Sequence, residues 1–139
     1  MFKLALCQIV SSADKDQNIA KAEKFIREAA ENGAQVISLP EMWNCPYSND
    51  YFREYAEYEN GRSVSFMSKL AKELGVYIIG GSIAELADGD DGTSRVYNTC
   101  FCFDRLGNIV GRHRKVHLFD IDIEGGIRFM ESDTLTAGD

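Results

Sequence analysis

The sequence has few prolines and histidines, more acidic than basic residues, and no long apolar run. No stretch of 18 apolar residues occurs among its 139 residues, so no segment is expected to span a membrane. The first residues, Met1 to Gln8, lack the apolar region and the small-residue cleavage site of a secretory signal. Fifteen Lys and Arg residues against 22 Asp and Glu residues give a net charge of -7. This balance argues against a nucleic-acid partner, because phosphate binding requires a basic face.

Four cysteines are present, but they lack the close spacing of a disulfide framework. We therefore expect free thiols in a reducing compartment and a cytoplasmic location. The segment Gly80-Gly81-Ser82 does not have the spacing of a phosphate-binding loop, and no cofactor is expected. The length fits one domain or a large part of one, and the sequence contains no repeat or Pro-rich linker.

Apolar periodicity predicts a strand–helix–strand unit at the start of the chain. The first strand covers residues 2–10 and is expected to be buried, and the polar segment after it offers Asp14 or Asp16 as the helix N-cap. Gly33 ends the helix, and a second strand covers residues 35–39. The two strands are expected to be parallel and joined by a right-handed crossover. The apolar stripe of the helix consists of Ile19, Ala22, Phe25, Ile26, Ala29 and Ala30.

The rest of the chain alternates between connections and predicted elements. An aromatic-rich connection at residues 40–61 is expected to carry one short helix at 49–58, and long connections at strand ends often carry function. The elements predicted after it are a helix from Ser63 to Gly75, a strand at 76–83, an acidic turn at 87–93, a strand at 96–103, a turn at 104–108, a strand at 109–112 and a loop beyond Lys115. This order predicts an α/β layered fold with helices packed against a mixed sheet.

Glu41 is the first candidate for chemistry. It follows a predicted strand and Pro40, so its carboxylate is expected at the carboxyl end of the sheet, where ligand sites of α/β folds form. Trp43, Tyr47 and Phe52 are near in sequence and can exclude water, which makes a carboxylate a better base. A solvated loop acid is the alternative interpretation.

Lys115 is the second candidate, at the centre of a basic segment that follows the fifth predicted strand in another connection at the sheet edge. We expect it to converge with Glu41 on a common pocket. An ammonium beside a reacting carbonyl stabilises the negative charge that develops on its oxygen. A surface basic patch is the alternative, and we favour it for Arg112 and Arg114. His113 and His117 have an H-x3-H spacing that can bind zinc on a helix, but no helix is predicted there. We expect structural or hydrogen-bonding histidines and no metal.

The cysteines offer a weaker case for catalysis. Cys7 lies in a predicted strand, and Cys100 and Cys102 share one face of another, so all three are expected to pack in the core. Cys45 lies in the loop beside Glu41 and is the one thiol we consider as a nucleophile. That loop offers no preformed oxyanion donors.

Several segments, read in order along the chain, carry a family resemblance. They are Leu4–Gln8, Arg27–Ala34, Leu39–Glu41, Asn44 with Pro46 and Tyr47, Tyr77–Ile83, Tyr97–Thr99 and His113–Asp122. Together they resemble the N-terminal part of the nitrilase superfamily of carbon–nitrogen hydrolases, and within it the ω-amidase branch. Leu39–Glu41 resembles the motif of the general-base glutamate. His113–Asp122 is the most specific segment and resembles the catalytic-lysine motif.

The resemblance implies a four-layer α-β-β-α sandwich, assembled as dimers or larger oligomers, and Glu-Lys-Cys chemistry. Glu41 would be the general base, Lys115 would hold the oxyanion, and Glu131 would be the second active-site glutamate. Tyr47 and His117 are assigned to substrate binding. The implied partner is a small amide, in this branch an α-keto acid ω-amide such as 2-oxoglutaramate, and neither nucleic acid nor a membrane is implied.

One departure from the family concerns the nucleophile. The family's cysteine follows the lysine, but no residue after Lys115 is a cysteine. We therefore expect residues 1–139 to be the N-terminal part of a single carbon–nitrogen hydrolase domain, inactive as an amidase by itself. An open sheet edge and an exposed apolar face should result. Two alternatives stay open: a non-catalytic partial sandwich that serves as a binding or interaction module, and an unrelated α/β metal-binding domain built on His113 and His117.

Overall fold

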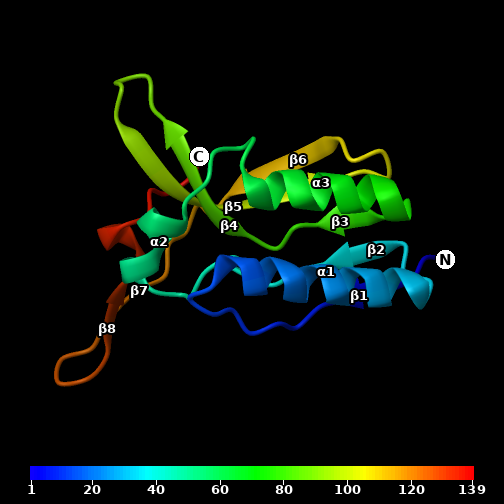
Figure 1. The fold of residues 1–139 in the computed structure, drawn as a ribbon. Coiled ribbons are helices and arrows are strands. Elements are labelled where there is room, and N and C mark those ends of the chain that lie inside the picture. The colour runs from blue at the N-terminus through cyan, green and yellow to red at the C-terminus, as the bar shows by residue number, and fades with distance from the viewer.

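The computed structural model describes every residue from Met1 to Asp139 and has a six-stranded mixed sheet with two long helices on one side (Figure 1). The helices are α1 (Lys15–Glu31), α2 (Asn49–Tyr55), α3 (Arg62–Leu74) and the 3-10 helix η1 (Glu131–Asp133). The strands are β1 (Leu4–Leu6), β2 (Val36–Ser38), β3 (Tyr77–Ile79), β4 (Ile83–Asp88), β5 (Ser94–Phe103), β6 (Ile109–Arg114), β7 (Asp120–Asp122) and β8 (Arg128–Met130). None of the helices is long and apolar enough to cross a membrane.

The parallel strand–helix–strand unit predicted at the start of the chain is confirmed. Strands β1, β2 and β3 lie next to one another and are parallel, although each has only three residues. Of the two predicted N-caps, Asp14 takes the position, because its Oδ1 accepts a hydrogen bond from the main-chain N–H of Gln17 (3.0 Å). Helix α3 ends at Gly75, whose left-handed conformation (φ 64°) suits a helix C-terminus.

The strand predicted at residues 76–83 is interrupted, and its continuation was missed. Strands β3 and β4 both pair with β5 in antiparallel fashion, with a break at residues 80–82. Gly81 has a φ of 61°, which turns the chain out of the strand conformation. Strand β4 then runs to Asp88, so the acidic turn is shorter than predicted.

Two further predictions about the second half of the chain have different outcomes. The hairpin of β5 and β6 is confirmed. The prediction of loop beyond Lys115 is wrong for β7 and β8, which form a separate two-stranded hairpin that projects from the body at the lower left of Figure 1. Each of these strands has only three residues, too few for an alternating apolar pattern to be recognised in the sequence.

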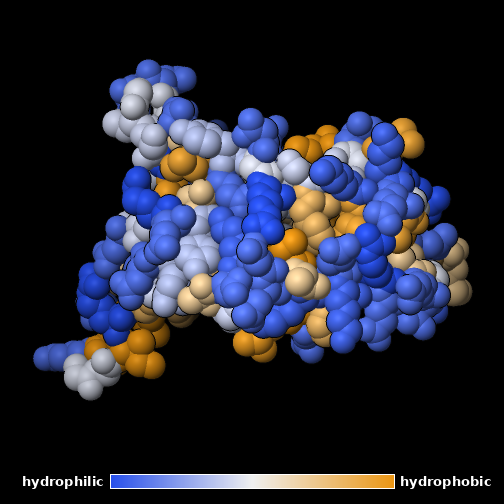
Figure 2. Space-filling view, viewed as in Figure 1, coloured by the Kyte–Doolittle hydropathy of each residue, from blue (hydrophilic) through white to orange (hydrophobic).

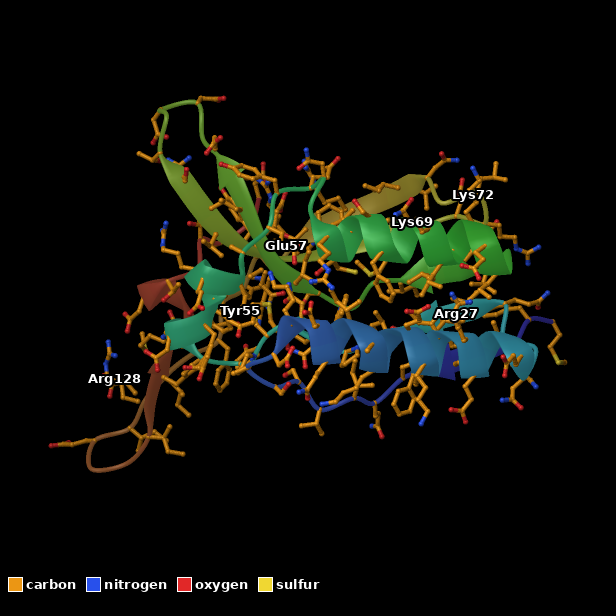
Figure 3. The ribbon with its side chains drawn as sticks, viewed as in Figure 1. Arg27, Tyr55, Glu57, Lys69, Lys72 and Arg128 are labelled. Atoms are coloured by element: carbon orange, nitrogen blue, oxygen red, sulfur yellow. The ribbon has the colours of Figure 1, made fainter.

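The main hydrophobic core lies between the sheet and the two long helices. Helix α1 contributes Ala22 and Ile26 to it, both fully buried, as the predicted stripe requires, whereas Phe25 is 38% exposed. Arg27 of α1 forms an ion pair with Glu73 of α3 (2.7 Å) and links the outer surfaces of the helices (Figure 3). The surface on this side is largely hydrophilic (Figure 2).

The opposite face of the sheet is not covered by any helix of the chain. Leu4 is in register with Val36 and Tyr77, and Leu6 is in register with Ser38 and Ile79. Register partners share a face, and Leu4, Leu6, Tyr77 and Ile79 are 39% to 73% exposed, whereas Val36 is half-buried. The expected burial of the first strand is therefore wrong, and the expected exposed apolar face is present.

A buried ion pair joins β4 to the end of β6. Glu85 is 2% exposed, and its two carboxylate oxygens accept hydrogen bonds from Nε and Nη2 of Arg114, each at 2.8 Å. The Thr99 hydroxyl donates a third bond (2.6 Å), and the Arg114 guanidinium lies 3.9 Å from the centre of the Tyr97 ring. Burial alone would raise the pKa of Glu85, but Arg114 and Thr99 hold it below its usual range. Arg114 is thus not the surface residue that the sequence suggested.

Replacing Arg114 by methionine is expected to lower the free energy of unfolding by about 3 kcal/mol, because Glu85 would stay buried without its counter-charge. Urea unfolding of this chain measures the change. Arg62→Met is the matched control, since Arg62 pairs with the exposed Asp16 and its loss should cost less than about 1 kcal/mol. Equal losses in both variants would contradict this account.

Candidate active site

Glu41 lies in a turn after β2, and hydrogen bonds join this turn to the break between β3 and β4. The main-chain N–H of Met42 donates to the hydroxyl oxygen of Ser82 (2.9 Å), and the N–H of Ser82 donates to the carbonyl oxygen of Pro40 (3.2 Å). Met42 has a φ of 48°, a left-handed conformation that costs on the order of 1 kcal/mol in a residue with a Cβ. A Cβ on Gly81 would lie 2.0 Å from the Pro40 oxygen, so glycine is required for this approach.

Lys115 is held by its main chain on two sides. Its N–H donates to the carbonyl oxygen of Asn98 on β5 (2.8 Å), and its carbonyl oxygen accepts from the N–H of Gly138 (2.9 Å). Its ammonium Nζ lies 2.9 Å from Oε1 of Glu41 and 3.1 Å from Oε2 of Glu131. The acid after the second strand and the amine after β6 therefore meet at one point, as the sequence predicted.

The charge of Lys115 is strongly favoured in this setting. Burial opposes the charge, but the hydrogen bonds and the negative charges of Glu41 and Glu131 outweigh it and hold the pKa of Lys115 well above its usual range. The three charged groups carry a net charge of about -1, since two carboxylates face one ammonium. Such an ammonium is a fixed positive charge suited to an oxygen that becomes negative.

Glu131 is fully buried and is the centre of the polar network. The Tyr47 hydroxyl donates to its Oε1, and the main-chain N–H of Phe119 donates to its Oε2. Burial, the bond to Glu131 and the neighbouring carboxylates raise the pKa of the Tyr47 phenol above its usual range. The hydroxyl predicted to face substrate is thus engaged by Glu131, while the Tyr47 ring packs edge-on against Phe52 (5.5 Å between ring centroids).

A polar cavity of about 300 Å³ opens beside the pair of Glu41 and Lys115. Its other lining residues are Gly81, Ser82, Asn98, Cys100 and His113. Cys100 and the other residues of β5 that alternate with the buried Phe101 and Phe103 point away from the helices, so the cavity lies on the uncovered side of the sheet. Glu131 and Tyr47 lie behind Lys115 and are not part of the lining.

Asn98 is a functional candidate that residue-by-residue inspection of the sequence did not identify. Its Nδ2 donates to Oε1 of Glu41 (2.8 Å), and it is 3% exposed. It therefore fixes the same carboxylate oxygen that Lys115 contacts. The signal available in the sequence was an amide side chain within a largely apolar strand. This signal becomes informative only when the register of the strand, and so the face on which the amide lies, is known.

The two histidines occupy different environments. His113 is exposed, lines the cavity and is in register with Cys100 of β5. His117 is exposed and outside the cavity lining, so the substrate-binding role assigned to it rests on the resemblance alone. Neither ring makes a hydrogen bond within the chain, in contrast to the hydrogen-bonding histidines expected. No group of three or more His, Cys, Asp or Glu side chains is arranged to hold a metal ion.

All four cysteines are free thiols. Cys45 is fully buried, and burial raises its pKa to about 12, which is unsuitable for a nucleophile at neutral pH. Cys7 is in the core, as predicted. Cys100 and Cys102 were expected there too, but they lie on the uncovered side of the sheet and are partly exposed. Burial and the neighbouring Cys102 raise the pKa of Cys100 to about 12.

Strongly alkaline pH is expected to destabilise this network. Tyr47 and Lys115 both have folded-state pKa values raised above their ordinary values near 10, so the folded chain retains protons that the unfolded chain releases. Their contribution to stability is complete below pH 10 and is lost as the pH rises further. Urea unfolding at pH 9 and pH 11 should show the decrease, by less than about 1.4 kcal/mol per group and pH unit, because Tyr47 is 41% exposed.

Tyr47→Phe should lessen this decrease, because it removes the phenol proton that Glu131 accepts. Tyr77→Phe is the matched control, since the Tyr77 ring is 43% exposed and its hydroxyl makes no hydrogen bond. An identical pH dependence in the two variants would show that the bond between Tyr47 and Glu131 does not contribute to the loss of stability at alkaline pH.

The fold and the Glu-Lys-Glu arrangement define a class of hydrolase, and sequence comparison gives the same class. The chain belongs to the carbon-nitrogen hydrolase family, whose model matches residues 3–139. It is 50% identical over 138 residues to "Omega-amidase NIT2-B" of Xenopus laevis, covering 99% of this chain and 48% of that protein. It is 48% identical over 138 residues to "Omega-amidase NIT2" of Homo sapiens, with the same coverage. The resemblance drawn from the motifs is confirmed.

Solved structures agree with this assignment. Nit3 of Saccharomyces cerevisiae, a member of branch 10 of the nitrilase superfamily, matches with a TM-score of 0.77 and 38% identity over 93% of this chain and 45% of that chain. The C. elegans NitFhit protein matches with a TM-score of 0.76, covering 99% of this chain and 33% of that chain, and at 24% identity it supports the fold alone. The expected fold class is confirmed. The chain spans about half the length of the curated relatives it matches.

Proposed function

We propose that this chain provides the acid–base and oxyanion-binding half of an amide-hydrolysing site of ω-amidase type. The observation that supports the proposal best is the contact of 2.9 Å between Lys115 Nζ and Glu41 Oε1 at the wall of a polar cavity. Relatives at about 50% identity carry the name omega-amidase, which favours an α-keto acid ω-amide such as 2-oxoglutaramate as substrate.

Each group has a role in the proposed reaction. Glu41 takes the proton of a cysteine thiol, and the thiolate attacks the amide carbonyl carbon. The carbonyl oxygen becomes an oxyanion beside the Lys115 ammonium. The C–N bond then breaks, the nitrogen receives the proton held by Glu41 and leaves as ammonia, and a thioester remains. Glu41 next takes a proton from water, which attacks the thioester and releases the carboxylate and the thiol.

The thiol is proposed to come from outside these 139 residues. Cys45 is fully buried, and Cys100, which shares the cavity with Glu41, has a pKa raised to about 12. Neither has the lowered pKa that activates a catalytic thiol. Glu131 is proposed to keep Lys115 charged and aimed at the cavity. The substrate-binding roles proposed for Tyr47 and His117 rest on the resemblance, because neither side chain lines the cavity.

The alternative function is a non-catalytic interaction module. The apolar face that includes Leu6 (73% exposed) and Tyr77 (43% exposed) favours association with another protein surface, because monomeric proteins seldom expose large apolar patches. We propose that this face also supports a homo-oligomer, and that the free thiols belong to a protein of the reducing cytoplasm.

Ammonia release from 2-oxoglutaramate tests the proposal in two proteins. The first is this chain alone, for which no release is expected. The second is a chimera in which this chain replaces the matching 48% of Xenopus laevis omega-amidase NIT2-B, for which release is expected. A simple nitrile should be a poor substrate for the chimera. A folded chimera that releases no ammonia would favour the interaction module, and release by the chain alone would point to Cys100 as the nucleophile, a result checked with Cys100→Ala.

A further inference from the structure

The hydrogen-bond donors of the cavity are of two kinds, those already engaged and those still free. The Lys115 ammonium contacts Glu41 and Glu131, and the Asn98 amide donates to Glu41. The Ser82 hydroxyl oxygen accepts a bond from Met42, but its hydrogen is not donated to any group of the chain. The ring of His113 is entirely free. The free donors are therefore the groups available to a ligand.

His113 is placed to serve the same ligand as Lys115. The two residues are two positions apart, and both line the cavity. Strand β6 ends at Arg114, but the N–H of Lys115 still donates to Asn98 of β5, so the pairing continues to Lys115 and the strand spacing applies. Residues i and i+2 are then separated by about 6.6 Å along the strand axis. Four C–C bonds of about 1.5 Å span about 5 Å when extended, which is the distance between the two end carbons of a five-carbon ω-amide. A ligand with its amide at Lys115 would therefore bring its far end to His113.

The charges of the site determine where an acidic ligand group can bind. Lys115 already lies between two carboxylates, and this group of three has a net negative charge of about one. A ligand carboxylate would be repelled there and stabilised farther along the strand by a neutral or positive donor. His113 is the one lining side chain with a free ring N–H, and it is not among the groups that contact Glu131.

We propose that His113, with the hydroxyl of Ser82, binds the carboxylate at the far end of the amide substrate and thereby selects acidic amides over uncharged ones. This assignment rests on the proposed amide-hydrolysing function and names the residue of the same cavity that recognises the substrate carboxylate. It also differs from the resemblance, which assigned His117 to substrate binding.

NMR spectroscopy of this chain tests the assignment without any turnover. The chain contains only two histidines, so its spectrum has two sets of ring C–H resonances, and His113→Gln identifies those of His113. The probes are glutaramate, which has an amide and a carboxylate on five carbons, and pentanamide, which lacks the carboxylate. We expect saturable movement of the His113 resonances with glutaramate and no movement with pentanamide.

Three outcomes would overturn the assignment: His113 resonances that do not move with glutaramate, His113 resonances that move equally with both probes, and movement confined to His117. None of them bears on ammonia release by the chimera, so failure of this assignment is distinguishable from failure of the proposed function.

The chimera provides a second measurement in the presence of turnover. His113→Leu should raise KM for glutaramate about tenfold with little change in kcat, because a hydrogen bond to a charged group is lost from ground state and transition state alike. The kcat/KM for pentanamide should stay at the parental value. A His113→Leu variant with equal losses on both amides would assign His113 a structural role instead.

Discussion

Replacing Lys115 by methionine is expected to reduce ammonia release by the chimera by about two to three orders of magnitude, which corresponds to one lost oxyanion donor. Methionine has a similar length and no charge, so the cavity would keep its shape while the oxyanion loses its positive partner. The change should appear in kcat rather than in KM, because the charge on the oxygen develops only in the transition state. Initial rates over a range of 2-oxoglutaramate concentrations separate the two constants.

The same substitution affects the fold, and this effect must be measured separately. Glu131 is fully buried and would lose its ammonium partner, although it would keep the bonds from Tyr47 and Phe119. We expect a loss of about 3 kcal/mol in the free energy of unfolding. Rates are therefore compared at a temperature at which circular dichroism shows both chimeras folded.

Lys69→Met is the matched control. Lys69 is an exposed lysine on α3, on the helical side of the sheet, away from the cavity (Figure 3). Its replacement should leave kcat and the urea midpoint within experimental error of the parent. Near-parental ammonia release by a folded Lys115→Met chimera would remove Lys115 from the proposed mechanism.

Much of the framework of this protein follows from local signals in its sequence. Helices α1 and α3 were predicted because apolar side chains recur at three and four residues and because Gly33 and Gly75 end the two segments. Glu41 and Lys115 were predicted to converge because both follow strands at the same edge of a sheet. These inferences use only the residues next to each position in the sequence, together with the rule that the carboxyl ends of parallel strands lie at one edge of a sheet.

The parts that sequence inspection missed depend on register and on contacts between distant segments. Cys100 and His113 face the cavity together because β5 and β6 pair in one particular register, and a shift of β6 by one residue would turn His113 away. The break at Gly81 exists because the turn at Pro40 approaches it closely. The bond from Tyr47 to Glu131 joins residues 84 positions apart and has no local signature.

The uncovered sheet face explains why burial was mispredicted for the first strand. An apolar run predicts that a surface will be covered, but it does not say which element covers it. Leu6 is 73% exposed because the chain has helices on only one side of its sheet. The apolar pattern of β1 and β3 is thus a property of the expected sandwich rather than of the two layers that these residues form.

Glu41→Gln is expected to reduce ammonia release by the chimera by roughly four orders of magnitude, the upper range for loss of a general base. Glutamine has nearly the shape of glutamate and can still accept the bonds of Asn98 and Lys115 through its carbonyl oxygen. It cannot take a proton from a thiol or from water. Both halves of the proposed reaction therefore fail, which is why this loss should exceed that of Lys115→Met.

The fold should tolerate this substitution. The Glu41 side chain is 50% exposed, and Lys115 keeps its contact with the buried Glu131, so the free energy of unfolding should change by less than about 1 kcal/mol. Loss of activity without loss of stability is the result that distinguishes a base from a structural acid. Glu54→Gln on α2 is the matched control, an exposed glutamate that makes no ion pair and should keep parental activity. Activity within tenfold of the parent in a folded Glu41→Gln chimera would mean that another group accepts the thiol proton, and the contact between Glu41 and Lys115 would then be an ion pair without a role in proton transfer.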